Sequence, residues 1–223
     1  MTVGEIINAV RWCFDEEQTD SADFRNASGN DCTLMDNIIK SKIGDAVRWI
    51  SLYAPSDILG GSDTASINTG IMTDATMYPT AISGTTGGML TMPSDFIRLV
   101  RVRVSGWHRA VKDPIAEDSD EYLQLRDVNG AEATVDRPMA AIIDKATKEV
   151  EVWPTGSSAE ITYISEPSVN ISSSASSSTN VAIPPRAKSA FIYYLAFLVL
   201  SAYEDSRAMR MYEIAKMNIG KNE

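Results

Sequence analysis

The sequence predicts an α+β protein in which helices from both ends of the chain form a bundle, with a small antiparallel β subdomain inserted between them. Three observations predict it. Residues 190–202 form an almost wholly apolar run of helical type. Two amphipathic helical patterns precede Pro55, and short alternating β patterns fill the middle of the chain. We expect the amphipathic helices to pack around the apolar one.

Composition narrows the class of protein. The chain has 223 residues, of which 44% are hydrophobic and 22% are charged, as in soluble globular proteins. Its formal net charge of -10 argues against a protein that binds phosphates over a broad surface. Cys13 and Cys32 match no disulfide framework or zinc motif, so we expect reduced thiols. No basic segment leads into an apolar run at the N-terminus, which predicts synthesis and use in the cytoplasm.

Two helices are predicted near the N-terminus. Thr2 and Glu5 have the spacing of a capping box, and apolar residues follow at helical spacing to Phe14. A second start signal, Thr33 with Asp36, opens a helix that ends before Pro55. Each helix has one apolar face and therefore needs a partner.

The middle of the chain alternates strand patterns with polar loops. Residues 96–104 read as a strand, and a short helix is predicted within residues 115–127. Residues 59–88, rich in Gly, Ser and Thr, are interpreted as a projecting loop with room for a short hairpin. Residues 168–180 are low-complexity and predicted to be flexible. Further strand patterns occupy residues 89–92, 140–144, 149–154 and 160–164.

The C-terminal segment begins with Pro185, which suits a first helical turn. We expect the apolar run 190–202 to be surrounded by protein, followed by a turn near Asp205 and an amphipathic helix to Ile219. A membrane span is the rival interpretation, but thirteen residues at about 1.5 Å each cover about 20 Å of a roughly 30 Å hydrocarbon core.

These elements predict five segments. They are the N-terminal part of the bundle (1–58), a projecting polar loop (59–88), the inserted β subdomain (89–167), a flexible Ser-rich loop (168–182) and the C-terminal part of the bundle (183–223).

The sequence offers no catalytic constellation. His108 is the only histidine, and nothing in the sequence specifies the nucleophile and orienting partner that a general base needs. No phosphate-binding glycine motif occurs. The acidic group 117–121 lacks the glycine and the spacing of a calcium loop, so a solvated acidic face is the expectation and a metal site the alternative. We therefore predict a protein that is not an enzyme and has no cofactor or metal.

Charge is unevenly distributed in the β subdomain. Residues 96–112 carry five bases and no acid, whereas residues 113–132 carry seven acids and one base. If the two segments lie on different faces, copies in a ring could meet base to acid. The alternative is that both are merely solvated on a monomer. A less favoured interpretation is that the arginines near Trp107 form a weak nucleic-acid-binding patch. The candidate interface charges are Arg98, Arg101, Arg103, Glu117, Asp118, Asp120 and Glu121.

The order of elements resembles a known family. The residues that carry the resemblance are the helices VGEIINAVRWCFDE and LMDNIIKSKIGDAVRWISLYAP, the stretch MLTMPSDFIRLVRVRVSGWHRAV, the pieces DRPMAAIID, VEVWP and TYISEPS, and the ending IPPRAKSAFIYYLAFLVLSAYEDSRAMRMYEIAK. Their succession resembles the head-to-tail adaptor, or connector ring, proteins of short-tailed bacteriophages, and most of all the ring proteins of crAss-like phages.

This resemblance implies a structural virion protein at the head-tail interface. It would form a ring, expected to be a dodecamer, between the portal protein and the next tail or ring protein. Double-stranded DNA would pass through it without specific binding, and no membrane would be involved. The family has no catalytic residues to transfer. Two alternatives stay open: a soluble monomeric binding module that regulates a phage or host partner, and a hydrolase built on His108.

Overall fold

The computed structural model describes residues 1–15, 30–59, 72–112, 114–126, 133–144, 148–167, 169 and 171–220. The chain forms two compact units. The first, here called the bundle unit, comprises Met1–Ile71 and Pro167–Glu223, and the second, the β unit, comprises Met72–Glu166. The described strands lie in the β unit, in largely antiparallel sheets, and most of the helices lie in the bundle unit, which confirms the α+β prediction.

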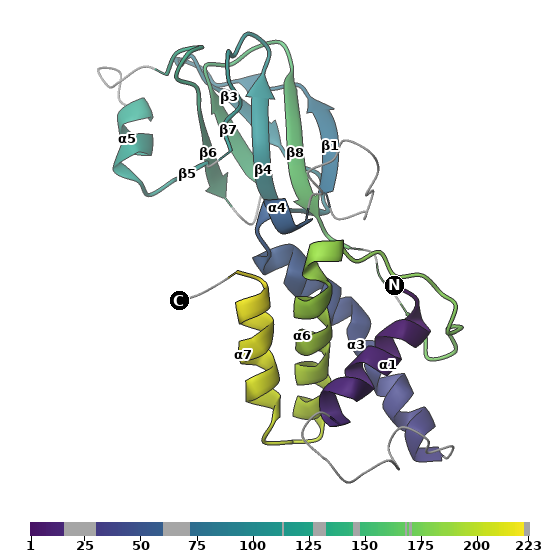
Figure 1. Cartoon of the computed structure of the whole chain (residues 1–223). Helices are drawn as coiled ribbons and strands as arrows, with labels where there is room; N and C mark the ends of the chain where they lie inside the picture. The colour runs from purple at the N-terminus through teal and green to yellow at the C-terminus, as the bar shows by residue number, and fades with distance from the viewer. Residues whose placement is uncertain are drawn as a thin grey trace. The chain divides into compact units, whose positions relative to one another are not determined.

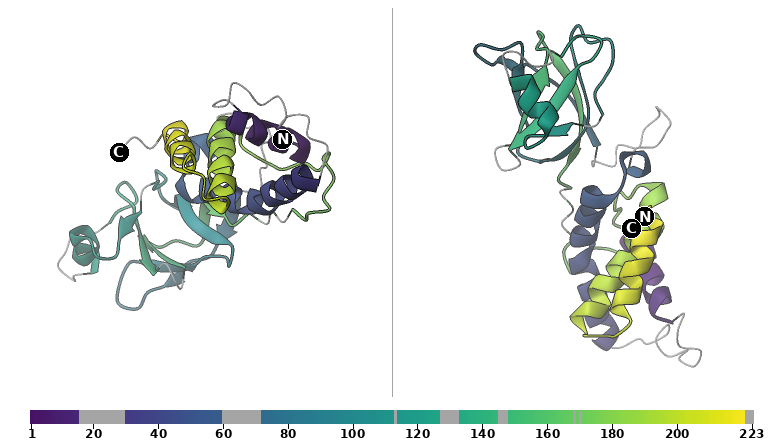
Figure 2. Two further views of the ribbon diagram at one scale, coloured as in Figure 1. Left: turned by 90° about the horizontal axis from the view of Figure 1, so that it is seen from below. Right: turned by 90° about the vertical axis from the view of Figure 1, so that its left-hand side faces the viewer.

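The bundle unit is organised around the apolar helix α6, as predicted. Helices α1, α3 and α7 each contact α6, and α1 and α7 lie on either side of it (Figures 1 and 2). The side chains of Phe191, Leu195 and Val199 on α6 are completely buried. The elements of the unit are α1 (Val3–Asp15), α3 (Asn30–Tyr53), α4 (Ser56–Leu59), the 3₁₀ helix η1 (Pro185–Ala187), α6 (Lys188–Ala202) and α7 (Ala208–Asn218).

The start of α1 has the predicted capping box. The Thr2 backbone N–H donates to Glu5 Oε2 at 2.9 Å, and the Glu5 N–H donates to Thr2 Oγ1 at 3.2 Å. The start of α3 differs from the prediction, because the helix begins at Asn30 rather than near Thr33. Asn30 and Asp31 are residue types that favour a first helical turn, so the sequence contains an earlier start signal than the one we used.

The expectation that the apolar run of α6 is surrounded by protein is only partly correct. The run is apolar all round, but Tyr193, Tyr194, Phe197 and Leu198 are only half-buried. The Trp49 ring of α3 stacks on Tyr194 at a centroid distance of 4.0 Å and an interplanar angle of 6°. Burial raises the pKa of the Tyr194 hydroxyl. Helices α3 and α7 therefore cover this side of α6 incompletely.

The predicted turn between the last two helices is confirmed. Glu204 adopts a left-handed φ of 56°, and the Asp205 N–H donates to the Leu200 carbonyl at 3.1 Å. The Asp205 carboxylate accepts bonds from the Arg207 side chain, the shortest at 2.6 Å. Arg207 also donates to the carbonyl of Phe14 at 3.2 Å, which ties the turn to the end of α1.

This turn should make stability depend on pH. The hydrogen bonds from Arg207 lower the pKa of Asp205 from 3.8 to about 2. A carboxylate with a depressed folded-state pKa stabilises the protein above its unfolded pKa and loses that effect as pH falls through the folded value. We expect the free energy of unfolding to drop by about 1–2 kcal/mol from this group between about pH 4 and pH 2.

Urea denaturation at several pH values measures the effect as the difference between the protein and Asp205→Asn. That difference should shrink toward low pH, since other carboxylates titrate equally in both proteins. Asp57→Asn, at an exposed position on α4, is the matched control, and its difference from the parent should show no such trend. A constant difference between the protein and Asp205→Asn across the range would contradict the argument.

The β unit is a sandwich of two sheets. The three-stranded sheet has the order β1-β8-β4 and the five-stranded sheet the order β2-β3-β7-β6-β5. All strand pairs are antiparallel except β5 with β6. The strands are β1 (Met72–Met77), β2 (Thr80–Ala81), β3 (Gly88–Thr91), β4 (Phe96–Val104), β5 (Ile115–Ala116), β6 (Met139–Asp144), β7 (Glu149–Trp153) and β8 (Ala159–Ser165), with the helix α5 (Asp120–Arg126) after β5.

The core of the β unit lies between the two sheets. Alternate residues of each strand point into it, among them Val102 and Val104 of β4, Ile161 of β8 and Val150 and Val152 of β7. Two tryptophan rings pack near the end of β7. Trp107 Nε1 donates to the Pro154 carbonyl at 2.8 Å. Gly87 lies so close to the Trp153 ring that a Cβ on Gly87 would be 2.8 Å from the ring.

The prediction of a projecting loop over residues 59–88 is wrong for residues 72–77, whereas the short hairpin that it allowed for is present, as β2 paired with β3 from Thr80↔Met89 to Ala81↔Gly88. From Met72 to Met77 the chain forms β1, which pairs with β8 from Met72↔Ile164 to Met77↔Ala159. Ala75 and Met77, two residues apart on β1, pack on the core. The high Gly, Ser and Thr content of the segment made this strand alternation hard to recognise. Residues 60–71 lie outside the described residues.

The Ser-rich stretch makes bonds to the bundle unit that the sequence did not predict. Its residues 171–181, here called the strap, run along the bundle unit and bond to it through the backbone. The N–H groups of Val3 and Gly4 donate to the carbonyls of Thr179 and Ser177 at 2.8 and 2.9 Å. Lys40 Nζ donates to two further strap carbonyls at 3.0 and 3.1 Å. The low-complexity sequence needs no apolar side chains for this, because the contacts use backbone carbonyls.

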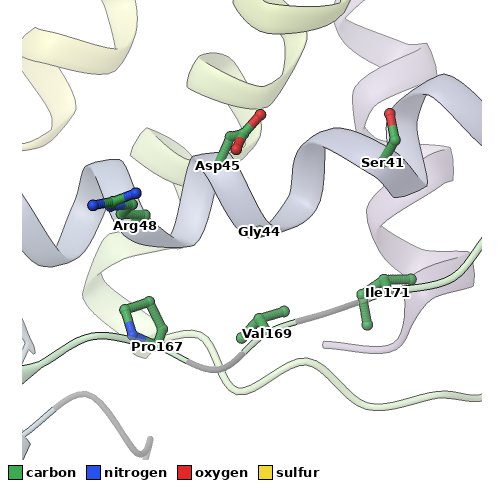
Figure 3. Close-up of a pocket in the computed structure, with 7 residues that line it drawn as sticks. All are labelled: Ser41, Gly44, Asp45, Arg48, Pro167, Val169 and Ile171. Atoms are coloured by element: carbon green, nitrogen blue, oxygen red, sulfur yellow. The ribbon is translucent and has the colours of Figure 1, made fainter. Parts of the chain in front are cut away.

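The chain enters the strap through a close approach to α3. Gly44 faces Val169 across a hollow that Pro167 and Ile171 also line (Figure 3). A Cβ on Gly44 would lie 2.7 Å from the Val169 carbonyl oxygen, closer than any ordinary contact. Glycine at this position therefore lets the returning chain lie against the helix.

Gly44→Ala should destabilise the protein by about 1–3 kcal/mol, because the new methyl group collides with the Val169 backbone. The sign is diagnostic, since the same change inside a helix ordinarily stabilises by about 0.5–1 kcal/mol. Chemical denaturation measures it. Ser41→Ala, one turn earlier on α3 and exposed, is the control and should change stability by less than about 0.5 kcal/mol. A Gly44→Ala protein more stable than the parent would contradict this account.

Candidate assembly surfaces

The predicted basic residues lie on the outer face of the three-stranded sheet. Arg101 and Arg103 alternate with core residues along β4 and are exposed. Arg101 Nε donates to Thr162 Oγ1 of β8 at 3.0 Å, and the Thr162 hydroxyl donates in turn to Asp74 of β1. Arg103 Nε donates to the Trp107 carbonyl at 3.4 Å. Both guanidinium groups are thus oriented by neighbours in their own unit and still reach solvent.

Arg98 differs from the other two arginines. It occupies a bulged part of β4, opposite Ile164, and its side chain is only half-exposed. Burial lowers the pKa of its guanidinium. Arg98 is therefore less accessible as a surface charge than Arg101 and Arg103.

The predicted acidic residues cluster at α5. Glu117 and Asp118 lie in the turn after β5, Asp120 and Glu121 begin the helix, and all four are exposed. This cluster, here called the acidic group, sits on a helix that packs through the buried Tyr122 and Leu125.

The helix α5 lies beside the edge strand β5 of the five-stranded sheet (Figure 1). The Tyr122 hydroxyl donates to the buried Glu151 carboxylate at 3.3 Å. Glu151 lies between the core residues Val150 and Val152 on β7, so its side chain points away from the core. The acidic group and the β4 arginines therefore lie on different faces of the β unit, as a base-to-acid contact between copies requires.

Sequence reasoning missed two acids beside the arginines. Glu160 of β8 lies directly opposite Arg103, and Asp74 of β1 lies in the row of Arg101. The face is thus mixed in charge, with its bases along β4 and its acids toward β1. Glu160 was readable from the alternation of its strand. The position of Asp74 on this face could not be predicted, because Asp74 belongs to a segment that was predicted to be a loop.

His108 lies on the surface of the β unit. Its Nδ1 contacts Asp136 Oδ1 at 2.5 Å, and the two side chains are 70% and 72% exposed. A histidine-carboxylate pair needs a bound nucleophile and shelter from water to catalyse hydrolysis. An exposure this high fits a surface hydrogen bond better than a catalytic pair.

Two further properties concern the described part of the chain. Within it, no three His, Cys, Asp or Glu side chains are grouped so that they could hold a metal ion. No helix among these residues is both long enough and apolar enough to cross a membrane.

Comparison with models of known protein families gives a match over nearly the whole chain. The family model described as SU10 adaptor protein matches residues 1–219, which is nearly the whole chain. No curated protein matches the sequence.

Proposed function

Because the chain belongs to the SU10 adaptor protein family, we propose that it forms a ring between the portal and the tail of a bacteriophage virion. The family makes the protein a structural adaptor of the phage, and its place is the virion. Ring formation, a dodecameric copy number and contacts with the portal protein and the next tail or ring protein are our proposal. A closer relation to the ring proteins of crAss-like phages remains a prediction.

The observation that carries the proposal is the separation of charge in the β unit. A closed ring needs two different, complementary surfaces on each copy. The acidic group at α5 and the exposed Arg101 and Arg103 on the outer face of the three-stranded sheet supply such a pair. Complementary charges orient neighbouring copies and suppress wrong contacts. We propose that each copy places its acidic group against the β4 arginines of the next.

The acidic balance supports a DNA conduit. A wall that binds phosphates would hold the DNA, since each neutralised phosphate adds a salt-dependent binding term. With 30 acids against 20 bases, the chain disfavours such binding. We propose that double-stranded DNA passes through the ring during ejection without specific contacts.

Native mass spectrometry tests the proposal. The purified protein is measured alone and then with the portal ring of the same phage. Closed oligomers in either sample, with added copies on the portal in the second, are the expected result. A monomer in both samples would overturn it. A monomer that forms a defined one-to-one complex with another phage or host protein would favour the alternative, a soluble binding module.

A further inference from the structure

A short segment after β4 extends the basic side of the three-stranded sheet. Val102 and Val111 exchange both of their backbone hydrogen bonds at 2.8 Å, as an antiparallel pair does. Both side chains pack on the core of the β unit. Because neighbours along an extended chain alternate in direction, the residues on either side of Val111 face outward, as Arg101 and Arg103 do on β4.

This pairing places a further cation on the outer face. Counted from the Val102↔Val111 bridge, Lys112 lies opposite Arg101, and Lys112 is exposed. The Cα atoms of such a neighbouring pair are about 4.5 Å apart. Lys112, Arg101 and Arg103, here called the basic triad, therefore stand side by side. Lys112 was not among the predicted interface charges.

The basic triad has no acid partner among the described residues. Arg101 and Arg103 use their Nε atoms for hydrogen bonds to neutral groups of the β unit. Within the part of the chain that the structure describes, no carboxylate forms an ion pair with these guanidinium groups or with Lys112 Nζ. Like charges directly opposite each other on a sheet are destabilising. An anionic partner would offset this repulsion.

The surroundings of the triad favour a compact cluster of carboxylates over a nucleic acid. A DNA duplex carries one negative charge per about 1.7 Å of its axis and binds through a broad basic surface. Here the bases are bordered by acids on the same face, since Glu160 lies opposite Arg103 and Asp74 lies in the row of Arg101. A compact group of acids can contact the triad without reaching these two carboxylates.

The acidic group supplies such a cluster, because its four exposed carboxylates lie within residues 117–121. It lies on a different face of the β unit from the β4 arginines, so it suits the triad of a neighbouring copy. We infer that Lys112 is a third contact residue of the surface formed by Arg101 and Arg103, and that the acidic group of the next copy places a carboxylate against Lys112 Nζ. The inference rests on the proposed ring and adds a residue to its contact.

Charge reversal at Lys112 tests the contact in the full-length protein. Native mass spectrometry over a concentration series compares Lys112→Glu with the parent, alone and with the portal ring. Association should be at least about tenfold weaker, because the reversal places like charges in contact. Lys112→Arg keeps the charge and should associate within about threefold of the parent. Lys188→Glu, the same change at an exposed position of the bundle unit, is the matched control and should also stay within about threefold.

Rescue identifies the partner. Every copy carries both surfaces, so a double variant exchanges the two charges at each contact of the ring. At least one double variant should return to within about threefold of the parent, and the acid whose reversal rescues is the one that faces Lys112. A role in folding alone would not be rescued by an acid on another face. Lys112→Glu is combined in turn with Glu117→Lys, Asp118→Lys, Asp120→Lys and Glu121→Lys.

Four outcomes would overturn the inference. Oligomers of Lys112→Glu equal to those of the parent would place Lys112 outside the contact and leave the proposed ring standing. A loss that no double variant reverses would mean that the acidic group is not the partner of Lys112. Weaker binding of a double-stranded DNA oligonucleotide by Lys112→Glu than by the parent would mean that the triad binds phosphates. Absence of oligomers for the parent, alone and with the portal ring, would remove the ring and this contact together.

Discussion

Phe191→Ala should destabilise the bundle unit by about 3–5 kcal/mol, the range for removing a buried aromatic ring from a close-packed core. Phe191 is completely buried in α6, the helix that α1, α3 and α7 all contact. Because α6 is shared by the whole unit, the cavity removes contacts from several helices at once. A loss of this size is a large part of the roughly 5–15 kcal/mol that stabilises a typical protein.

The measurement is chemical denaturation with a signal from each unit. Trp49 reports on the bundle unit and Trp107 on the β unit, since each is buried in its own core. Tyr203→Ala is the matched control, because this aromatic side chain ends the same helix but is 47% exposed. It should cost less than about 1 kcal/mol. Equal losses for the two variants would mean that α6 is not the organising element of the unit.

The sequence was most informative where one physical rule decided the local structure. The capping box at Thr2 and the alternation along β4 each gave an element that the structure confirms. The apolar run 190–202 likewise identified the central helix before any neighbour was known. In these places local propensity and burial point to the same answer.

It was least informative where order comes from distant backbone contacts. The strand β1 is polar in composition and is defined by its pairing with β8, about ninety residues later in the chain, as the register Thr73↔Tyr163 illustrates. The strap is held by carbonyls that bond to Lys40 and to the start of α1. Local sequence patterns do not predict such contacts, because β pairing and bonds to backbone carbonyls depend on which distant segments the tertiary structure places side by side.

For the candidate surfaces, the sequence supplied the residues but not their arrangement. The contrast between residues 96–112 and 113–132 was visible in composition. Their placement on different faces of the β unit became visible only from the structure, through the alternation of Glu151 with core valines and the bond from Tyr122. Arg98 is partly buried and lies in a bulged part of β4, and no sequence pattern marked that bulge.

Reversing either charged surface should abolish assembly. Replacing Glu117, Asp118, Asp120 and Glu121 with lysine would place like charges against the arginines of the next copy. Replacing Arg101 and Arg103 with glutamate would do so from the other side. Like-charge contacts cost several kcal/mol, so we expect each variant to associate at least about a hundredfold more weakly than the parent. Native mass spectrometry across a concentration series measures this.

Mixing the two variants makes the test specific. The lysine variant is basic on both surfaces and the glutamate variant is acidic on both, so neither assembles with itself while each complements the other. The mixture should form closed oligomers of strictly alternating composition, which a ring with an even copy number such as a dodecamer permits. Raising the salt concentration should weaken both the parent and the mixed oligomer.

A control variant with Asp57→Lys and Glu204→Lys changes exposed charges in the bundle unit and should assemble as the parent does. Circular dichroism of each variant separates lost assembly from lost folding. Variants that fold but stay monomeric even when mixed would rule out complementarity between these two surfaces, since restored opposite charges would then have failed to restore the contact. Variants that assemble alone would mean that the charges are merely solvated, and the interface would have to be sought in the bundle unit.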